Sequence, residues 1–255
     1  MHRNIQAVFF DAGYTLLCMD PDQPTIFRNV CAELEIELDH TRFHDGIAHA
    51  NAMLAPRQPH EVPKPFSRTA IDEFWIAYNR ALLSVCARRP RDAEKAEDVY
   101  RRFEASISWR VYDEVRPVLA DLRERGLRLG VISNWTGDLE EVLAGVGLRK
   151  AFDFVLDSAR LGHEKPHDPI FAEAVRRADV ARDAALHVGD SPEHDVEGAI
   201  ASGLSAVLLD RNARHHGYRK APRIENLREL SSFLEQLGAR EHEHARDGGS
   251  QVPDR

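Results

Sequence analysis

The stretch FFDAGYT, from Phe9 to Thr15, contains the residues that decide how this chain folds. The apolar run Val8-Phe9-Phe10 predicts a short buried strand, and Gly13 predicts a tight turn soon after it. Asp11 therefore ends a strand, where the loop exposes its carboxylate to the ligand crevice of an α/β sheet. A carboxylate in that position can attack phosphorus or carbon. Taken alone, however, Asp11 fits a turn or helix-capping aspartate better.

The pattern of a short apolar run that ends in polar residues recurs further along the chain. These runs are Leu127–Asn134, Phe154–Ser158, Ala184–Ser191 and Ala206–Asp210. Helical patterns separate them, among them a segment from Asp138 to Gly145 that has Asp138 as its expected N-cap. Strands that alternate with helices at this spacing predict βαβ units. We therefore expect an α/β fold in which helices cover both faces of a parallel sheet.

The alternation is interrupted once, from about Cys18 to about Tyr112, where no strand pattern is evident. Apolar residues recur there with helical spacing. The expected helical segments are Ile26–Leu34, Arg42–Leu54, Thr69–Ala87 and Ala93–Ile107. A Pro-rich stretch from Ala55 to Pro65 predicts a loop between them. The sequence thus predicts a helical insert after the first strand, in a place where it would cover the ligand crevice.

These patterns predict three parts of the chain. Residues 1–17 and 113–238 are expected to form the sheet domain, and residues 18–112 the helical cap. Residues 239–255 are polar and contain glycines, so we expect a disordered tail.

Two further segments add groups suited to phosphate binding. Ser133 ends a predicted strand and is followed by Asn134, so a hydroxyl and backbone N–H groups can hold a phosphoryl oxygen. Lys165, in the segment Lys-Pro-His-Asp-Pro, precedes a predicted helix and can neutralise a carboxylate nucleophile or phosphoryl oxygens. Each motif is weak alone, because Ser-Asn turns are common and most lysines face solvent.

The segment HVGDSPEHD, from His187 to Asp195, supplies two carboxylates across a strand-to-helix turn. Asp190 follows an apolar strand, and Asp195 opens the next predicted helix. Two such carboxylates can share one hard divalent cation, and Mg²⁺ prefers one or two carboxylates together with water and phosphate oxygens. We expect Asp190 to be a metal ligand, and Asp195 to combine metal binding with helix capping.

The motifs in this order resemble those of the haloacid dehalogenase (HAD) superfamily of hydrolases, in particular the HAD-like hydrolase domain proteins. The resemblance covers about residues 5–237. It implies a Rossmann-like, doubly wound parallel sheet with strand order 5-4-1-2-3 and a helical cap inserted after the first motif. It further implies that Asp11 is the nucleophile and that Ser133, Asn134 and Lys165 bind phosphate, with Asp11, Ser133 and Lys165 forming the catalytic set.

The resemblance also implies Mg²⁺ as the cofactor. Its ligands would be Asp11, the backbone carbonyl of Gly13, Asp190 and Asp195, the last directly or through water. Gly13 is a departure from the family pattern, since phosphatases of the family usually have a second aspartate there as general acid and base. Such help is worth about 10²- to 10⁴-fold in rate. The leaving group could need little protonation, another residue could act instead, or hydrolysis could be slow.

Three functions therefore remain open. The first is a Mg²⁺-dependent phosphatase that hydrolyses a small phosphorylated metabolite through an aspartyl-phosphate on Asp11. The second is a carbon–halogen hydrolase, which needs neither the second aspartate nor a metal and would leave Asp190 without a purpose. The third is a binding or regulatory protein built on an enzyme fold, because a fold alone does not fix function.

Composition narrows the expected partners and location. The chain has 255 residues, of which 43% are hydrophobic, enough for one large domain or a domain with a smaller insert. The net charge of −8 argues against nucleic acid as a partner. No apolar run reaches the roughly 20 residues of a membrane span. Cys18, Cys31 and Cys86 have no metal or disulfide spacing, so we expect reduced thiols in a cytoplasmic protein.

Overall fold

The computed structural model describes residues 4–54 and 68–237. The expected loop from Ala55 to Pro65 and the expected tail at 239–255 lie outside the described residues. The chain divides into two compact units. Leu17–Arg110 form one of them, called here the helical unit, and the segments before and after it form the other, called here the sheet unit.

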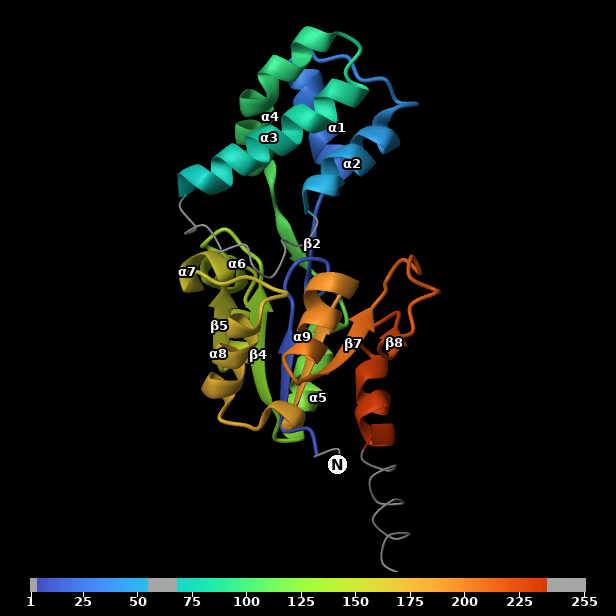
Figure 1. The fold of residues 1–255 in the computed structure, drawn as a ribbon. Helices are drawn as coiled ribbons and strands as arrows, with labels where there is room; N and C mark the ends of the chain where they lie inside the picture. Colours follow the sequence, from blue (N-terminus) through green and yellow to red (C-terminus); the bar gives the residue numbers. More distant parts are fainter. Residues whose placement is uncertain (1–3, 55–67, 238–255) are drawn as a thin grey trace, which may run out of the picture. The chain divides into compact units, whose positions relative to one another are not determined.

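A six-stranded parallel sheet forms the centre of the sheet unit (Figure 1). Its strands are β1 (Ala7–Phe10), β4 (Arg128–Ser133), β5 (Phe154–Asp157), β6 (Ala185–Gly189), β7 (Ser205–Leu209) and β8 (Arg223–Ile224), and their order is β5-β4-β1-β6-β7-β8. The first five strands in chain order thus have the expected 5-4-1-2-3 arrangement, and the α/β fold is confirmed. The edge strand β8 was not predicted, because two residues are too short to form a periodic pattern.

The register of the sheet brings the predicted polar residues to one edge. In β1, Phe10 pairs with Val131 of β4 on one side and with Val188 of β6 on the other. The N–H of Asp11 then donates to the carbonyl of Val188 at 2.9 Å. Asp11 therefore lies level with the carboxyl ends of β4 and β6, where parallel sheets of this kind bind ligands.

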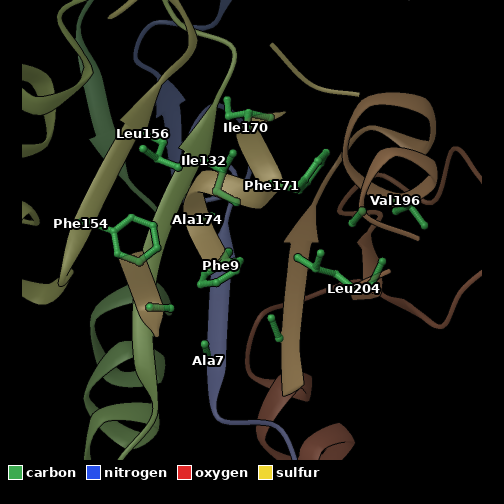
Figure 2. Close-up of a cluster of buried hydrophobic side chains, with 14 of the residues drawn as sticks. Ala7, Phe9, Ile132, Phe154, Leu156, Ile170, Phe171, Ala174, Val196 and Leu204 are labelled. Carbon is green, nitrogen blue, oxygen red and sulfur yellow. The ribbon is translucent and has the colours of Figure 1, made fainter. Parts of the chain in front are cut away.

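Alternating side chains of the central strands pack on helices (Figure 2). Phe9 of β1 points toward the face covered by α8 (Asp168–Ala178), where it joins Phe171, and its ring meets Phe154 edge-on at 5.6 Å between centroids. The connection from β6 to β7, made by the π-helical turn η5 (Pro192–Glu197) and α9 (Gly198–Ala201), adds Val196 to the same cluster. Full burial of side chains of this size contributes about 1.5–3 kcal/mol each.

The other two crossovers run toward the opposite edge of the sheet. They are made by α5 (Val115–Glu124) and α6 (Leu139–Gly145), while the short α7 (Ser158–Leu161) follows β5. Since such connections are right-handed, α5 and α6 cover the face opposite to α8. The sheet is therefore covered on both sides, as the apolar strands predict.

The N-cap residue of α6 is Asp138, as predicted. Asp138 occupies the N-cap position, but its carboxylate makes no capping bond and instead accepts from Trp135 Nε1 at 2.9 Å. The N–H groups of Gly137 and Leu139 donate to Asp157 Oδ2 at 2.9 and 3.2 Å. Asp138 is thus the N-cap residue, but the carboxylate that accepts from the first N–H of the helix, that of Leu139, belongs to Asp157 at the end of β5.

The helical unit packs four α-helices around its own apolar core. They are α1 (Gln23–Glu33), α2 (Phe43–Asn51), α3 (Arg68–Cys86) and α4 (Ala96–Ser106), with 3₁₀ turns η1 (Ala52–Leu54) and η2 (Pro90–Lys95). The prediction that residues 18–112 contain no strand was wrong. β2 (Leu17–Met19) and β3 (Trp109–Val111) form a two-stranded sheet, and three residues each are too few to give an alternating pattern.

None of the helices within residues 4–54 and 68–237 combines the length and the apolar character that a bilayer crossing requires.

Candidate active site

Four predicted residues meet directly at the carboxyl edge of the sheet. The hydroxyl of Ser133 donates to Asp11 Oδ1 at 2.8 Å, and Lys165 Nζ donates to the same oxygen at 2.7 Å. Lys165 Nζ also donates to Asp195 Oδ1 at 2.5 Å. Residues more than 100 positions apart in sequence thus surround one carboxylate, because each follows a strand or turn at the same edge of the sheet.

Asp11 has one engaged and one open oxygen. Both bonds from Ser133 and Lys165 reach Oδ1, and Oδ2 accepts no hydrogen bond from the described residues. The residue is 7% exposed, so few water molecules compete for the open oxygen. A buried carboxylate with one oxygen held and the other free is suited to nucleophilic attack through the free oxygen.

Lys165 is fixed at its backbone as well as at its ammonium group. The side-chain amide of Asn134 accepts from the N–H of Lys165 at 2.8 Å and donates to its carbonyl at 2.9 Å. Burial alone would lower the pKa of Lys165, but Asp11 and Asp195 outweigh it and hold this pKa above its ordinary value. The ammonium is therefore charged. The Asn134 side chain thus orients the lysine, while the expectation that Asn134 binds phosphate stays a prediction.

Asp195 holds the lysine from the other side. Its Oδ1 accepts from Lys165 and lies 3.0 Å from His187 Nε2, and its Oδ2 accepts from the N–H of Ser191 at 3.0 Å. Burial would raise the pKa of Asp195, but Lys165 and His187 outweigh it and hold this pKa far below its usual range. A side chain at Gly189 would overlap the Asp195 carboxylate, so glycine is required at the end of β6.

The capping role expected of Asp195 belongs to another residue. Asp195 lies inside the π-helical turn η5, whereas Ser191 is the N-cap and its hydroxyl accepts from the N–H of His194 at 3.2 Å. The prediction of Asp195 as a cap was therefore wrong, because the helical turn begins at Pro192, before Asp195.

His187 is a site residue that the sequence analysis missed. It is fully buried in β6, next to Asp195, with its ring edge-on to Phe171 at 5.4 Å between centroids. Burial lowers its pKa despite the Asp195 charge, so the imidazole is neutral and its Nε2–H donates to Asp195. The available signal was a polar residue within an otherwise apolar strand.

Asp190 completes an acidic cluster that could hold a metal. Asp11, Asp190 and Asp195 each place a carboxylate oxygen within 4.8 Å of the others. Burial, followed by the charges of Asp11 and Asp195, raises the pKa of Asp190 well above its ordinary value. Three carboxylates face one ammonium group, so the cluster has excess negative charge. All the potential metal ligands in this cluster are carboxylate oxygen atoms, which fits a hard divalent cation such as Mg²⁺.

The backbone conformation at position 13 does not require a glycine. It is absent from the positive-φ residues of the described chain, and a Cβ built on it would lie 3.6 Å from Trp135 Cζ3, an ordinary van der Waals distance. Tyr14, by contrast, has a φ of 57°, in the left-handed region. The loop after Asp11 could therefore accommodate a side chain at position 13.

Comparisons with known proteins agree with this geometry. A family model for haloacid dehalogenase-like hydrolases matches residues 5–203. Haloacid dehalogenase-like hydrolase domain-containing protein 3 of Bos taurus is 42% identical over 123 residues, which are 47% of this chain and 49% of that protein. The chain thus spans about half the length of the curated relatives of that name.

Two other matches extend over nearly the whole chain. Ribulose-1,5-bisphosphate 5-phosphatase of Halopiger xanaduensis is 30% identical over 246 residues, 91% of this chain and 96% of that protein. The crystal structure of YfnB from Bacillus subtilis has the same fold, with a TM-score of 0.73 over 91% of this chain and 100% of that one, at 19% identity. The chain belongs to the haloacid dehalogenase-like hydrolase family, and the resemblance inferred from its motifs is confirmed.

Proposed function

We propose that this protein is a Mg²⁺-dependent phosphatase that hydrolyses a small phosphorylated metabolite through an aspartyl-phosphate on Asp11. The observation that carries the proposal is the acidic cluster of Asp11, Asp190 and Asp195, in which Asp11 and Asp195 share the buried ammonium group of Lys165. A relative that matches 91% of this chain is named as a sugar bisphosphate phosphatase, which supports the same class of substrate.

The proposed reaction begins at the open oxygen of Asp11. Oδ2 attacks the phosphorus atom, a P–O bond forms, and the bond from phosphorus to the leaving oxygen breaks with its electron pair on that oxygen. Water then attacks the phosphorus of the acyl phosphate, which releases inorganic phosphate and restores the carboxylate. Lys165 remains beside the attacked group throughout and neutralises part of its charge.

Ser133 has a proposed role in holding the phosphoryl group. Its hydroxyl, which donates to Asp11 Oδ1 at 2.8 Å, can turn to a phosphoryl oxygen without moving the strand. The backbone N–H of Asn134 follows it and can donate to the same group, while the side chain of Asn134 keeps the lysine in place.

The proposed cation would be held by Asp11, Asp190, the carbonyl of Gly13 and Asp195, the last through water because both its oxygens are already bonded. When bound, Mg²⁺ offsets the negative charge of the phosphoryl oxygens and of the carboxylates. The excess of negative charge in the cluster is what a cation at this place would balance.

Gly13 limits the proposed range of substrates. With no carboxylic acid at this position, an alkoxide leaving group would depart without a proton donor from position 13. Acyl phosphates and anhydrides leave more readily and are the favoured substrates. Of the carboxylates that follow in sequence, Asp22 caps α1 by accepting from the N–H of Thr25 at 2.8 Å, so it already has a structural role. Residues 18–112 are proposed as the cap that selects the substrate.

A dehalogenase is the second candidate function. Halide departs without a proton, so Gly13 suits that reaction too. Asp190 argues against it, because metal-independent attack on carbon has no use for a third carboxylate beside Asp11 that burial disfavours.

A panel of assays tests the proposal. Phosphate release from acetyl phosphate and p-nitrophenyl phosphate is measured with Mg²⁺ and with EDTA, and halide release from 2-chloropropionate is measured in parallel. We expect Mg²⁺-dependent phosphate release that is faster from acetyl phosphate. EDTA-insensitive halide release would favour the dehalogenase. Silence in both assays, with tight binding to another macromolecule, would favour a binding protein.

A further inference from the structure

Arg211 makes an unusual set of contacts beside the loop that carries Asp11. Its Nε donates to the carbonyl of Tyr14 at 3.1 Å, and its Nη2 donates to the carbonyl of Thr15 at 2.8 Å. Its Nη1 donates to Glu114 Oε1 at 2.5 Å. The guanidinium lies over the ring of Tyr112, 3.7 Å from the centroid. One side chain thus engages four residues, and none of these contacts belongs to the proposed reaction.

The loop after Asp11 needs such support because it leaves the sheet at once. β1 ends at Phe10, and Tyr14 adopts a left-handed conformation with φ of 57°, which is costly for a residue with a side chain. The N–H of Leu16 donates to the carbonyl of Ala12 at 2.9 Å and closes the turn. The carbonyls of Tyr14 and Thr15 both accept from Arg211, so one side chain outside the turn supplies two of its hydrogen bonds.

Arg211 is itself rigidly held. It follows β7 and Asp210, whose buried carboxylate accepts from the N–H groups of Arg214 and His215 at 2.8 and 2.9 Å. The Arg211 side chain is only 13% exposed, and that of its partner Glu114 only 7%. A planar guanidinium in a dry setting, with an ion pair on one side and two carbonyls on the other, has a single preferred orientation.

We propose that Arg211 is a positioning residue for the nucleophile loop. By fixing the carbonyls of Tyr14 and Thr15, it holds the turn that begins at Asp11 and sets the direction of the Gly13 carbonyl. Arg211 does not touch the reacting atoms, and it acts on them through the loop. The catalytic part of this inference rests on the proposed phosphatase function, whereas the loop-holding part stands on the contacts alone.

The test compares Arg211→Ala with Arg123→Ala. Arg123 also combines a carbonyl with a carboxylate, since its Nη2 donates to the carbonyl of Ala151 at 3.1 Å and its Nη1 lies 3.0 Å from Asp153 Oδ2. Those groups precede β5, at the edge of the sheet away from Asp11. Arg211→Lys keeps the positive charge but lacks the planar guanidinium with its several donors. It therefore separates the effect of charge from the effect of hydrogen-bond geometry.

Two readouts are measured on each full-length variant, namely steady-state kinetics and amide hydrogen exchange of the peptide spanning residues 10–17. We expect Arg211→Ala to lower kcat about 100-fold with KM changed less than about threefold, since a misplacement near 1 Å has that effect. We expect Arg211→Lys to recover part of kcat. Exchange in residues 10–17 should become at least about tenfold faster in Arg211→Ala. Arg123→Ala should change neither readout.

The outcomes separate the two proposals. If the wild-type protein releases no phosphate, the proposed function fails, and hydrogen exchange alone decides whether Arg211 holds the loop. Unchanged exchange in Arg211→Ala would overturn the inference, and so would faster exchange with unchanged kcat in an active enzyme. An equal effect of Arg123→Ala would show general destabilisation and would overturn it as well. If Arg211→Ala does not fold, Arg211→Lys undergoes the same two measurements under the same criteria.

Discussion

The charged side chains at the two edges of the central sheet differ in how they are paired and in how far they are exposed. At the amino edge, Asp153 pairs with Arg123 at 3.0 Å and with Arg128 at 3.2 Å, and both arginine side chains are at least one third exposed. At the carboxyl edge, Asp11 and Asp195 share the ammonium of Lys165, whose side chain is 2% exposed. The Asp153 cluster has two cations for one carboxylate and its arginines are in contact with water, whereas Asp11 and Asp195 share one cation that is buried.

This difference indicates which edge the chain maintains for function. Ion pairs between partly exposed groups contribute at most about 1 kcal/mol to stability. Buried charges that are not fully compensated are costly, by several kcal/mol each. A chain selected only for stability would not retain Asp190 beside Asp11 and Asp195, where burial and like charge both oppose its ionised form. A cation and a phosphoryl group are the occupants that would make such a cluster favourable.

The largest expected effect comes from removing the proposed nucleophile. Asp11→Asn should lower kcat by about 10³-fold or more, because an amide oxygen cannot form the acyl phosphate. Asp153→Asn, the matched change at the amino edge, should leave kcat within about twofold. Phosphate release under saturating substrate measures both variants. Undiminished turnover by Asp11→Asn would rule out covalent catalysis through this residue.

Removal of the Lys165 ammonium group should lower the stability of the protein as well as its turnover. Lys165→Met leaves Asp11 and Asp195 buried without their partner, and we expect a loss of about 3–5 kcal/mol in the free energy of unfolding. Arg128→Met removes a cation that is half exposed, and should change it by less than about 1 kcal/mol. Urea unfolding in EDTA measures both. Similar losses in the two variants would mean that the edges do not differ in their electrostatics.

Asp190→Asn should have the opposite effect on the metal-free protein. Below about pH 4, Asp190 is protonated in the folded and the unfolded chain. Between that pH and its raised folded pKa, the folded protein keeps a proton that the unfolded chain has lost, so stability falls as pH rises. Asparagine has no such proton. In EDTA, the variant should therefore become more stable than the wild type by about 1–2 kcal/mol at pH 7.

The difference in stability between Asp190→Asn and the wild type should become smaller toward pH 4. Thermal unfolding at several pH values measures this difference. Mg²⁺ should raise the Tm of the wild type and not that of the variant. An equal response to Mg²⁺ in both proteins would mean that Asp190 does not contribute to cation binding.

The carboxyl edge of the sheet shows which site residues can be predicted from the sequence and which cannot. The strand-end positions of Asp11 and Ser133 were readable because apolar strands of a parallel sheet end in polar residues at one edge. The partners that hold those groups were not readable. His187 lies in a buried strand, and Asn134 bonds a backbone 31 positions away, so neither leaves a local pattern. The short strands β2, β3 and β8 were missed for a related reason, since only pairing with a distant segment defines them.

The smallest expected effect adds a charge to the carboxyl edge instead of removing one. Gly13→Asp introduces a carboxyl group where a Cβ meets only Trp135, at 3.6 Å, and where φ allows any residue. We expect phosphate release from p-nitrophenyl and alkyl phosphates to rise about tenfold, less than the full benefit of a well-placed general acid. Acetyl phosphate hydrolysis should change little, because its leaving group needs no proton. Gly13→Ala is the control for the added Cβ and should leave all rates near those of the wild type. If Gly13→Asp binds Mg²⁺ normally and yet slows alkyl phosphate hydrolysis, proton donation from position 13 is not what limits this site.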